Sequence, residues 1–278
     1  MGALETPLTS NPTFLPKSDP PLRETELFGA RLTFTDEGGE HETTLFAVHG
    51  VPGSVRDFRY LAPPLNAFAR LIRVDLPGSG GSAPRREALR SLEARAETVL
   101  RLADHLKISA FGVIGHSMGA GTALVTASMA PDRISHLVLI APMGLRPHRG
   151  LSQSQASFKR IALMLRVPGL RQLLLPQVKK HFRKRRFPRA EEMTVHEYAT
   201  QFESFTAADY PLLKRAAARP LPARTLVAFA DDDHLVEPQI PIELAAAIPG
   251  ARTLRFEEGG HIIQKTRAAE IARAIRDL

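Results

Sequence analysis

A serine, a histidine and a group of aspartates each follow an apolar run of the chain. Ser117 lies in the segment GHSMG, His261 ends the segment EEGGH, and residues 231–233 are three consecutive aspartates. A serine hydroxyl is a poor nucleophile at neutral pH. It therefore needs a histidine base within hydrogen-bond reach, and a carboxylate that orients this histidine. These residue types together predict nucleophilic catalysis by a serine.

Each of these residues also has a structural interpretation. The pattern G-x-S-x-G around Ser117 is short enough to describe a glycine-rich turn instead of a nucleophile. His261 could cap a helix, although its place between the last apolar run and the last helical segment favours a base. The carboxylate could come from any of the three aspartates, of which Asp231 and Asp232 more often shape a turn. His234 is an alternative base, but its position beside the aspartates is poor geometry for a triad.

The segment HGVPG (49–53) falls where a serine mechanism needs a second backbone donor. A tetrahedral oxyanion requires two preorganised N–H groups, and Pro52 has none. The backbone N–H groups of Val51 and of Met118, the residue after the serine, are therefore the predicted oxyanion hole. A simple loop is the alternative interpretation of this segment.

Two other features are predicted to be structural. The segment DLPGSGGS (75–82) is rich in glycine, but the Gly-Lys-Ser/Thr of a phosphate-binding loop does not follow it. A rigid turn is the favoured interpretation. His116, inside the GHSMG segment, is predicted to pack against the site and not to act as its base.

Apolar runs and helix-compatible segments alternate along the chain. We predict strands at 44–48, 71–75, 111–114, 137–140, 225–230 and 253–256. We predict helices at 87–106, 118–129, 238–247 and 266–278. This alternation predicts an α/β fold whose mostly parallel sheet has helices on both faces. Residues 30–35 and 44–48 are predicted to form a hairpin entering that sheet. Ligands bind beyond the carboxyl ends of parallel strands, where the candidate residues should meet.

The alternation stops in the middle of the chain. Residues 146–217 show helical periodicity without a convincing strand, which predicts a helical cap inserted into the α/β core. The core is then formed by residues 23–145 and 218–278. Residues 1–22 contain five prolines and little periodicity, so we expect an extended N-terminal arm.

Together these segments resemble the α/β-hydrolase fold family over residues 25–278, interrupted by the cap. The segments HGVPG, DLPGSGGS, GHSMG, DDDHLVEP and GGH stand in the family's order of oxyanion loop, nucleophile, acid and histidine. The resemblance implies that Ser117 is the nucleophile, Asp233 the acid and His261 the base. The chain departs from the family at Ala120 and Ala230, where glycine is commoner. Because Ala230 directly precedes the three aspartates, this second departure makes the position of the acid within the run less clearly defined.

The positive charge of the chain is concentrated in one segment. The net charge is +8, yet residues 158–189 hold eleven Lys or Arg and no Asp or Glu. This segment could be the solvated face of the cap, a basic amphipathic surface for anionic lipid, or a nucleic-acid or nuclear-import signal. We expect no nucleic-acid partner, because the rest of the chain has the pattern of an enzyme. Leucines in the segment predict an apolar substrate at the site mouth.

The sequence as a whole predicts a serine hydrolase of the esterase or lipase type. It would cleave a carboxylic ester with an apolar acyl or alkyl part, through an acyl-enzyme and without a metal or organic cofactor. The alternatives are a carbon–carbon bond hydrolase or lactonase on the same triad, and a hydrolase-like ligand-binding protein with little turnover. The absence of cysteine and of a long apolar run or secretory signal favours a cytoplasmic location.

Overall fold

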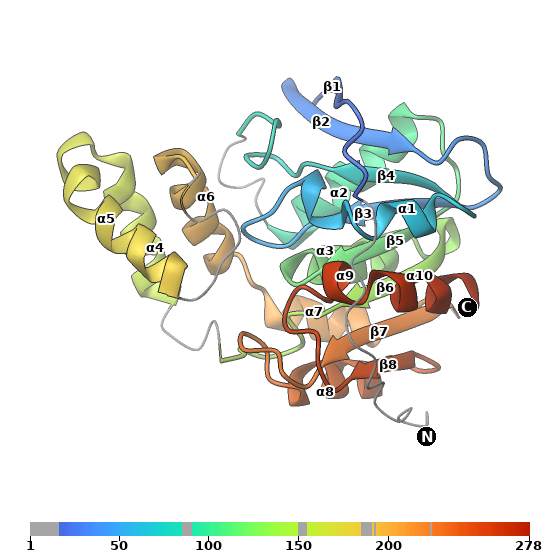
Figure 1. Cartoon of the computed structure of the whole chain (residues 1–278). Helices are drawn as coiled ribbons and strands as arrows, with labels where there is room; N and C mark the ends of the chain where they lie inside the picture. Colours follow the sequence, from blue (N-terminus) through green and yellow to red (C-terminus); the bar gives the residue numbers. More distant parts are fainter. Residues whose placement is uncertain (1–16, 85–90, 150–154, 185–190, 192, 223) are drawn as a thin grey trace.

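An eight-stranded, mostly parallel sheet forms the centre of the protein (Figure 1). The structure is a computed structural model and describes residues 17–84, 91–149, 155–184, 191, 193–222 and 224–278. The strands follow the spatial order β1-β2-β4-β3-β5-β6-β7-β8, and their pairing is parallel from β4 to β8. Their bounds are β1 Arg23–Leu27, β2 Ala30–Glu37, β3 Thr44–Val48, β4 Arg70–Val74, β5 Phe111–His116, β6 Ile134–Ile140, β7 Thr225–Ala230 and β8 Arg252–Phe256.

Helices cover both faces of this sheet, as the alternating pattern predicts. The α-helices are α1 Ala62–Leu65, α2 Leu92–His105, α3 Met118–Met129, α4 Gln155–Arg166, α5 Pro168–Lys184, α6 Val195–Thr206, α7 Tyr210–Ala217, α8 Gln239–Ala247, α9 Ile263–Thr266 and α10 Ala268–Arg276. Short 3-10 helices lie at η1 Val55–Phe58 and η3 Pro131–Arg133.

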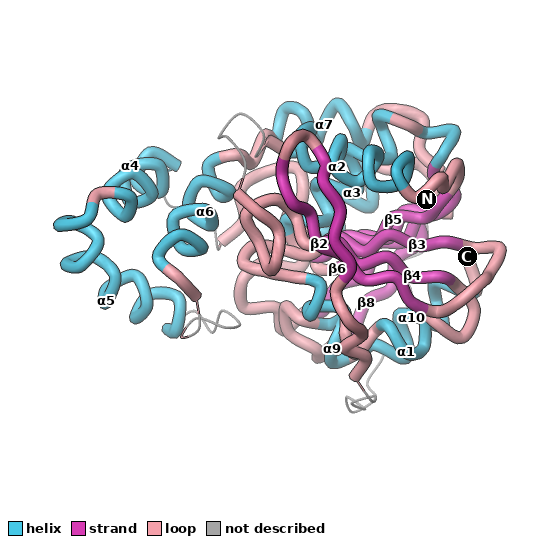
Figure 2. The backbone as a smooth tube through the Cα atoms, turned by 90° about the horizontal axis from the view of Figure 1, so that it is seen from above, coloured by secondary structure: helices cyan, strands magenta, loops and turns pink. Residues whose placement is uncertain are grey.

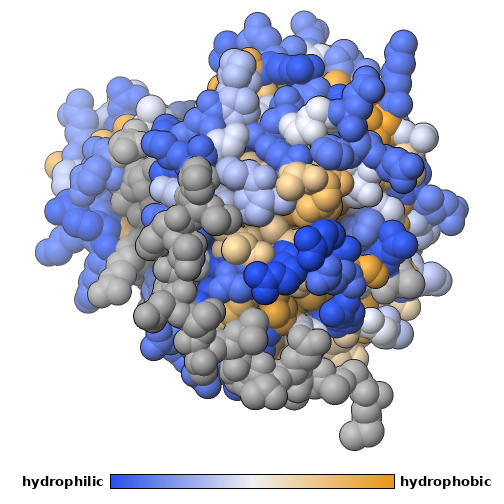
Figure 3. Space-filling view, turned by 45° about the vertical axis from the view of Figure 1, so that its right-hand side comes forward, coloured by the Kyte–Doolittle hydropathy of each residue, from blue (hydrophilic) through white to orange (hydrophobic). Residues whose placement is uncertain are grey.

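The core consists of two apolar layers separated by the sheet. Successive residues of β3 alternate between the layers, because side chains of a strand point to opposite faces in turn. Phe46 and Val48 join the layer under α2, α3 and α7, whereas Leu45 and Ala47 join the layer under α1 and α10. Burial on both faces explains why the strands read as continuous apolar runs. The surface over these layers is largely hydrophilic on the face seen in Figure 3.

The first strands of the sheet differ from the sequence prediction. The predicted hairpin between residues 30–35 and 44–48 is wrong, because β2 pairs with β1 and β4 instead. The strand β3 lies between β4 and β5, and four of its five residues are buried. An inner position suits its apolar sequence, whereas the charged residues of β1 suit the edge of the sheet. The β1 strand lacks an apolar run and was not predicted.

The helices α4, α5 and α6 form a group beside the sheet, with α6 nearest to the body (Figures 1 and 2). An aromatic cluster holds the group together: the ring of Phe182 lies 5.1 Å from that of Tyr198 and 5.5 Å from that of Phe202. The next helix, α7, packs on α3 in the main apolar layer. The division into an arm, a core and a cap over residues 146–217 stays a prediction.

Candidate active site

Ser117 occupies a strained turn between β5 and α3. Its φ of 54° lies in the left-handed region, which is costly for a residue with a side chain. The turn depends on close backbone approaches that only glycine permits. A Cβ atom on Gly115 would lie 2.3 Å from the Gly119 carbonyl oxygen, and one on Gly119 would lie 2.2 Å from that of Val48. The two glycines of the G-x-S-x-G pattern therefore let the serine occupy the tip of the turn, where it is half-buried.

The structure brings Ser117, His261 and Asp233 into one hydrogen-bonded chain. The Nε2 atom of His261 lies 2.9 Å from the Ser117 Oγ atom. On the other side of the ring, Nδ1 lies 2.7 Å from the Oδ2 atom of Asp233. A carboxylate can only accept, so Nδ1 carries the proton and Nε2 is free to accept from the serine hydroxyl. This is the tautomer that a serine nucleophile needs.

The carboxylate of Asp233 is held in its ionised form. Its Oδ1 atom accepts the backbone N–H groups of Leu235 and Val236, at 2.8 and 3.0 Å. Burial alone would raise the pKa of Asp233. The hydrogen bond from His261, the charge of that ring and the two backbone N–H groups outweigh burial, so the pKa lies below its ordinary value.

The other two aspartates of the run have different partners. Asp231 pairs with Arg255, with the guanidinium Nε 2.9 Å from its Oδ1 atom. Asp232 accepts the backbone N–H groups of Gly259 and Gly260, at 2.9 and 2.7 Å. It thereby holds the glycine loop that leads into the histidine. Only Asp233, among the three, contacts the ring of His261 in the structure.

The segment 49–53 lies beside the serine turn. A Cβ atom on Gly50 would lie 3.1 Å from the Ser117 Cβ atom, so the two backbones are in close contact. His49 fixes this segment: its Nε2 atom accepts the N–H of Leu76 at 3.0 Å, and its Nδ1 atom donates to the Gly50 carbonyl at 2.6 Å. Val51 lines the same cavity as Ser117. Met118 begins α3, where the first N–H groups have no partner within the helix.

The segment 75–82 is a hydrogen-bonded turn. The carboxylate of Asp75 accepts from the Thr33 hydroxyl at 2.8 Å and from the N–H groups of Val55 and Gly81 at 2.8 and 3.0 Å. It thus ties β2, η1 and the glycine turn together. The Asp75 side chain is almost fully buried, and it does not line the cavity at Ser117.

His116 is a buried neutral histidine that supports the site. Its Nε2 atom donates to the backbone carbonyl of His261 at 2.9 Å, and the centres of the two rings lie 5.0 Å apart. Burial, reinforced by the neighbouring charge of His261, lowers the pKa of His116 to about 3. Its Nδ1 atom is buried without a partner among the residues that the structure describes. His116 therefore joins the serine turn to the backbone of the histidine loop.

Sequence reasoning missed a second support, in the segment after β6. His148 is buried, and its Nδ1 atom lies 3.1 Å from the Leu235 carbonyl in the acid loop. The pKa of His148 is lowered, chiefly by burial. The backbone N–H of Arg149 donates to Glu237 at 2.8 Å, and Arg146 pairs with Glu243 at 2.7 Å. The charges of these side chains are visible in the sequence, but no sequence pattern links the segment after β6 to the acid loop, which lies about ninety residues further along the chain.

Ser117 and His261 open into a cavity of about 550 Å³. The lining contains apolar, acidic and basic side chains. They include Val51, Tyr60, Leu235 and Ile262, with Asp57 and Asp232, and with Arg56, Arg59 and Lys265. Within the described part of the chain, no residue of α4 to α7 lines this cavity. The prediction that leucines of the basic segment lie at the site mouth is therefore wrong: none of them is among the described lining residues. Leu163, Leu170 and Leu173 face solvent, and Leu165 is buried in the main apolar layer.

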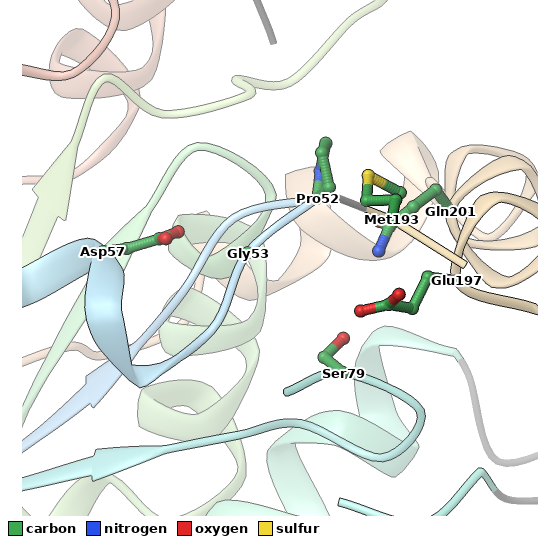
Figure 4. Close-up of a pocket in the computed structure, with 7 residues that line it drawn as sticks. All are labelled: Pro52, Gly53, Asp57, Ser79, Met193, Glu197 and Gln201. Atoms are coloured by element: carbon green, nitrogen blue, oxygen red, sulfur yellow. The ribbon is translucent and has the colours of Figure 1, made fainter. Parts of the chain in front are cut away.

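The helical group approaches the site at another point. Met193, which precedes α6, and Glu197 and Gln201 of α6 surround a cavity of about 10 Å³ together with Pro52 and Ser79 (Figure 4). In this view Glu197 points toward Ser79, and Met193 lies beside Pro52. A space of this size holds about one water molecule. The contact joins α6 to the predicted oxyanion loop but leaves no room there for a substrate.

Comparison with known proteins places this chain in a family. The pattern of the alpha/beta hydrolase family matches residues 45–274. The chain therefore belongs to the alpha/beta hydrolase family and has its fold. The enol-lactonase from Burkholderia xenovorans LB400 has a similar structure, with a TM-score of 0.72 and 24% identity, over 92% of this chain and 98% of that one.

Curated relatives carry several names. Two are dihydrolipoyllysine-residue acetyltransferase components of an acetoin cleaving system. The one from Pseudomonas putida is 41% identical over 45% of this chain, and the one from Cupriavidus necator is 30% identical over 86%. The chain spans only 34% and 64% of their respective lengths. The 2-hydroxymuconate semialdehyde hydrolase from Pseudomonas sp. strain CF600 is 27% identical over 94% of this chain and 95% of its own.

Proposed function

We propose that this alpha/beta hydrolase is a serine enzyme that cleaves a carboxylic ester with an apolar acyl or alkyl part. The observation that carries the proposal is the chain of hydrogen bonds from Asp233 through His261 to Ser117, which ends in a 550 Å³ cavity. A cavity of this volume lies within the range of ordinary small-molecule sites. Its apolar side chains, such as Tyr60 and Ile262, suit an acyl or alkyl group.

The proposed reaction uses each of these residues. The Ser117 Oγ atom attacks the ester carbonyl carbon while His261 Nε2 takes its proton, and Asp233 stabilises the imidazolium. The N–H groups of Val51 and Met118 hold the oxyanion. His261 then gives the proton to the leaving alcohol, which breaks the ester bond and leaves the acyl group on Ser117. Water attacks the acyl-enzyme with His261 again as base, releasing the acid and the free serine.

Labelling with a fluorophosphonate probe and an assay on nitrophenyl esters test the proposal. We expect wild-type protein to be labelled and to turn over a panel of acyl chain lengths. Ser117→Ala should lose the labelling and nearly all turnover, whereas Ser79→Ala, which changes a serine outside the hydrogen-bonded chain, should keep both. Unchanged labelling and turnover in Ser117→Ala would contradict the proposal. Tight ligand binding with negligible turnover by wild type would favour a binding protein instead.

A carbon–carbon bond hydrolase or lactonase is the second candidate. It is favoured by the full-length similarity to 2-hydroxymuconate semialdehyde hydrolase and by three basic side chains in the cavity, Arg56, Arg59 and Lys265. Such cations would attract a substrate that carries a carboxylate. Asp57 and Asp232 in the same lining reduce this attraction. Weak ester turnover together with clear activity on vinylogous diketones or lactones would favour this candidate.

A cytoplasmic location is also part of the proposal. The chain contains no cysteine, which suits a reducing compartment. None of the described helices is both long and apolar enough to cross a bilayer.

A further inference from the structure

The corner between α4 and α5 exposes an unusual concentration of apolar side chains. Four of the seven large hydrophobic residues that are exposed in the described structure lie here: Leu163 (66%), Val167 (44%), Leu170 (40%) and Leu173 (70%). Single exposed leucines are normal on a protein surface, but a contiguous group indicates an interaction site. We refer to these four residues as the apolar corner.

Basic side chains surround the apolar corner on the same helix faces. On α4, Lys159, Arg160 and Arg166 lie three or four residues from Leu163, so they are its neighbours on the helix surface. On α5, Lys180 lies two turns beyond Leu173 on the same face and is exposed. The apolar corner is therefore bordered by positively charged side chains on both helices.

Few carboxylates neutralise this charge. Neither α4 nor α5 contains an Asp or Glu. In the described part of the chain, Arg166 pairs with Glu203 of α6, and Arg183 pairs with Glu191. Lys159, Arg160 and Arg171 form no ion pair with another described residue, and all three are exposed. The surface of the α4–α5 pair is therefore strongly cationic.

We propose that the α4–α5 surface docks the protein on an anionic phospholipid bilayer. The four side chains of the apolar corner enter the boundary between headgroups and acyl chains, and the surrounding lysines and arginines contact lipid phosphates. A bilayer offers both an apolar layer and a negative surface. Nucleic acid offers the charge without a place for four exposed apolar side chains, so its binding is an outcome of the test and not the proposal.

The position of the surface is compatible with catalysis on the membrane. The α6 helix lies between the α4–α5 pair and the body of the protein (Figures 1 and 2). No described residue of α4 or α5 lines the cavity at Ser117. Docking would therefore leave this cavity open, and the inference holds whether or not Ser117 cleaves esters.

Flotation of the full-length protein with lipid vesicles tests the proposal. We expect binding to vesicles of phosphatidylcholine with roughly 30% phosphatidylglycerol, whose surface is negative like that of a phosphatidylserine-rich membrane. We expect no binding to vesicles of phosphatidylcholine alone. Because surface charges are screened by salt, binding should weaken between low salt and about 0.5 M salt. Replacing Leu163 and Leu173 together by Ser should weaken binding by about a hundredfold or more. Replacing Lys159 and Arg160 together by Gln should weaken it about thirtyfold.

Matched variants on the body of the protein serve as controls. Leu22→Ser with Met129→Ser removes two apolar residues of 51% and 44% exposure, and Arg273→Gln with Arg276→Gln removes two exposed charges of α10. Both controls should bind vesicles like wild type. All variants should keep the wild-type melting temperature and the wild-type ester turnover without vesicles, which separates a docking defect from misfolding.

Three results would overturn the proposal. The first is equal binding of wild type to neutral and anionic vesicles, or no binding to either. The second is wild-type binding by both α4–α5 variants, or equal losses in the control variants. The third is self-association through Leu163 and Leu173, or oligonucleotide binding through Lys159 and Arg160, in place of vesicle binding, which light scattering and gel shift would reveal.

Discussion

Replacing Asp233 by Asn gives the sharpest test of the hydrogen-bonded chain at Ser117. The Oδ1 atom of Asp233 accepts two backbone N–H groups, from Leu235 and Val236, so an asparagine must keep its oxygen there. Its NH₂ group then points at Nδ1 of His261, where Asp233 Oδ2 now lies at 2.7 Å. Because NH₂ can only donate, Nδ1 must accept, and the ring proton moves to Nε2.

A proton on Nε2 leaves the serine without a base. We expect kcat of Asp233→Asn to fall by about 10⁴-fold, as expected for a triad histidine in the wrong tautomer. This factor corresponds to about 5.4 kcal/mol of transition-state stabilisation. The assay is ester turnover with active-site titration, and circular dichroism verifies that the variant is folded.

Asp231→Asn and Asp232→Asn are the matched controls. The first weakens a partly exposed pair with Arg255, worth about 1 kcal/mol or less. The second keeps an oxygen that can still accept from Gly259 and Gly260. Both should retain turnover within about tenfold of wild type, since neither side chain contacts His261. If Asp233→Asn kept a tenth of the activity while either control lost a hundredfold, the assignment of Asp233 would be wrong.

Two further predictions concern stability. Gly119→Ala should destabilise the protein by about 3 kcal/mol, since its Cβ atom would meet the Val48 carbonyl oxygen at 2.2 Å. Gly169→Ala is the control and should not destabilise the protein, because its Cβ atom would have nothing within 4 Å. Equal shifts of the melting temperature in the two variants would contradict this prediction. The pKa of His116 is lowered to about 3, so the unfolded chain gains a proton below pH 6.5 while the folded protein does not. The free energy of unfolding therefore falls as pH falls, and His116 accounts for a loss of about 1.4 kcal/mol between pH 7.5 and 5.5. Denaturant unfolding of His116→Gln at the two pH values should show a decrease in the free energy of unfolding that is smaller by this amount.

The sequence predicted the parallel part of the sheet well. The runs 44–48 and 225–230 coincide with β3 and β7, because strands buried on both faces have few polar residues to obscure their bounds. The turn at Ser117 was recognisable since its chemistry depends on glycines with fixed spacing. The partner of His261 could be narrowed to three aspartates, and the structure distinguishes them by their hydrogen bonds.

Other features depend on partners that are distant in the sequence. The β1 strand is charged and has one apolar residue, and its pairing with β2 is visible only in three dimensions. The role of His148 depends on the Leu235 carbonyl, 87 residues away. Leucines of α4 and α5 suggested an apolar wall of the site, but helical periodicity does not reveal which stripe of a helix faces solvent. Leu165 is buried, while Leu163, two residues earlier, is exposed.

The origin of the cavity wall has a consequence for how such a protein can diverge. The described lining comes from the segments 50–60, 116–117, 232–235 and 260–265, which all lie outside α4 to α7. Substitutions in α4 and α5 can therefore accumulate without altering any atom of that lining. In evolutionary terms, the part of the gene that encodes these two helices can change the surface that the protein presents to its surroundings, while the residues that line the cavity at Ser117 are inherited unchanged.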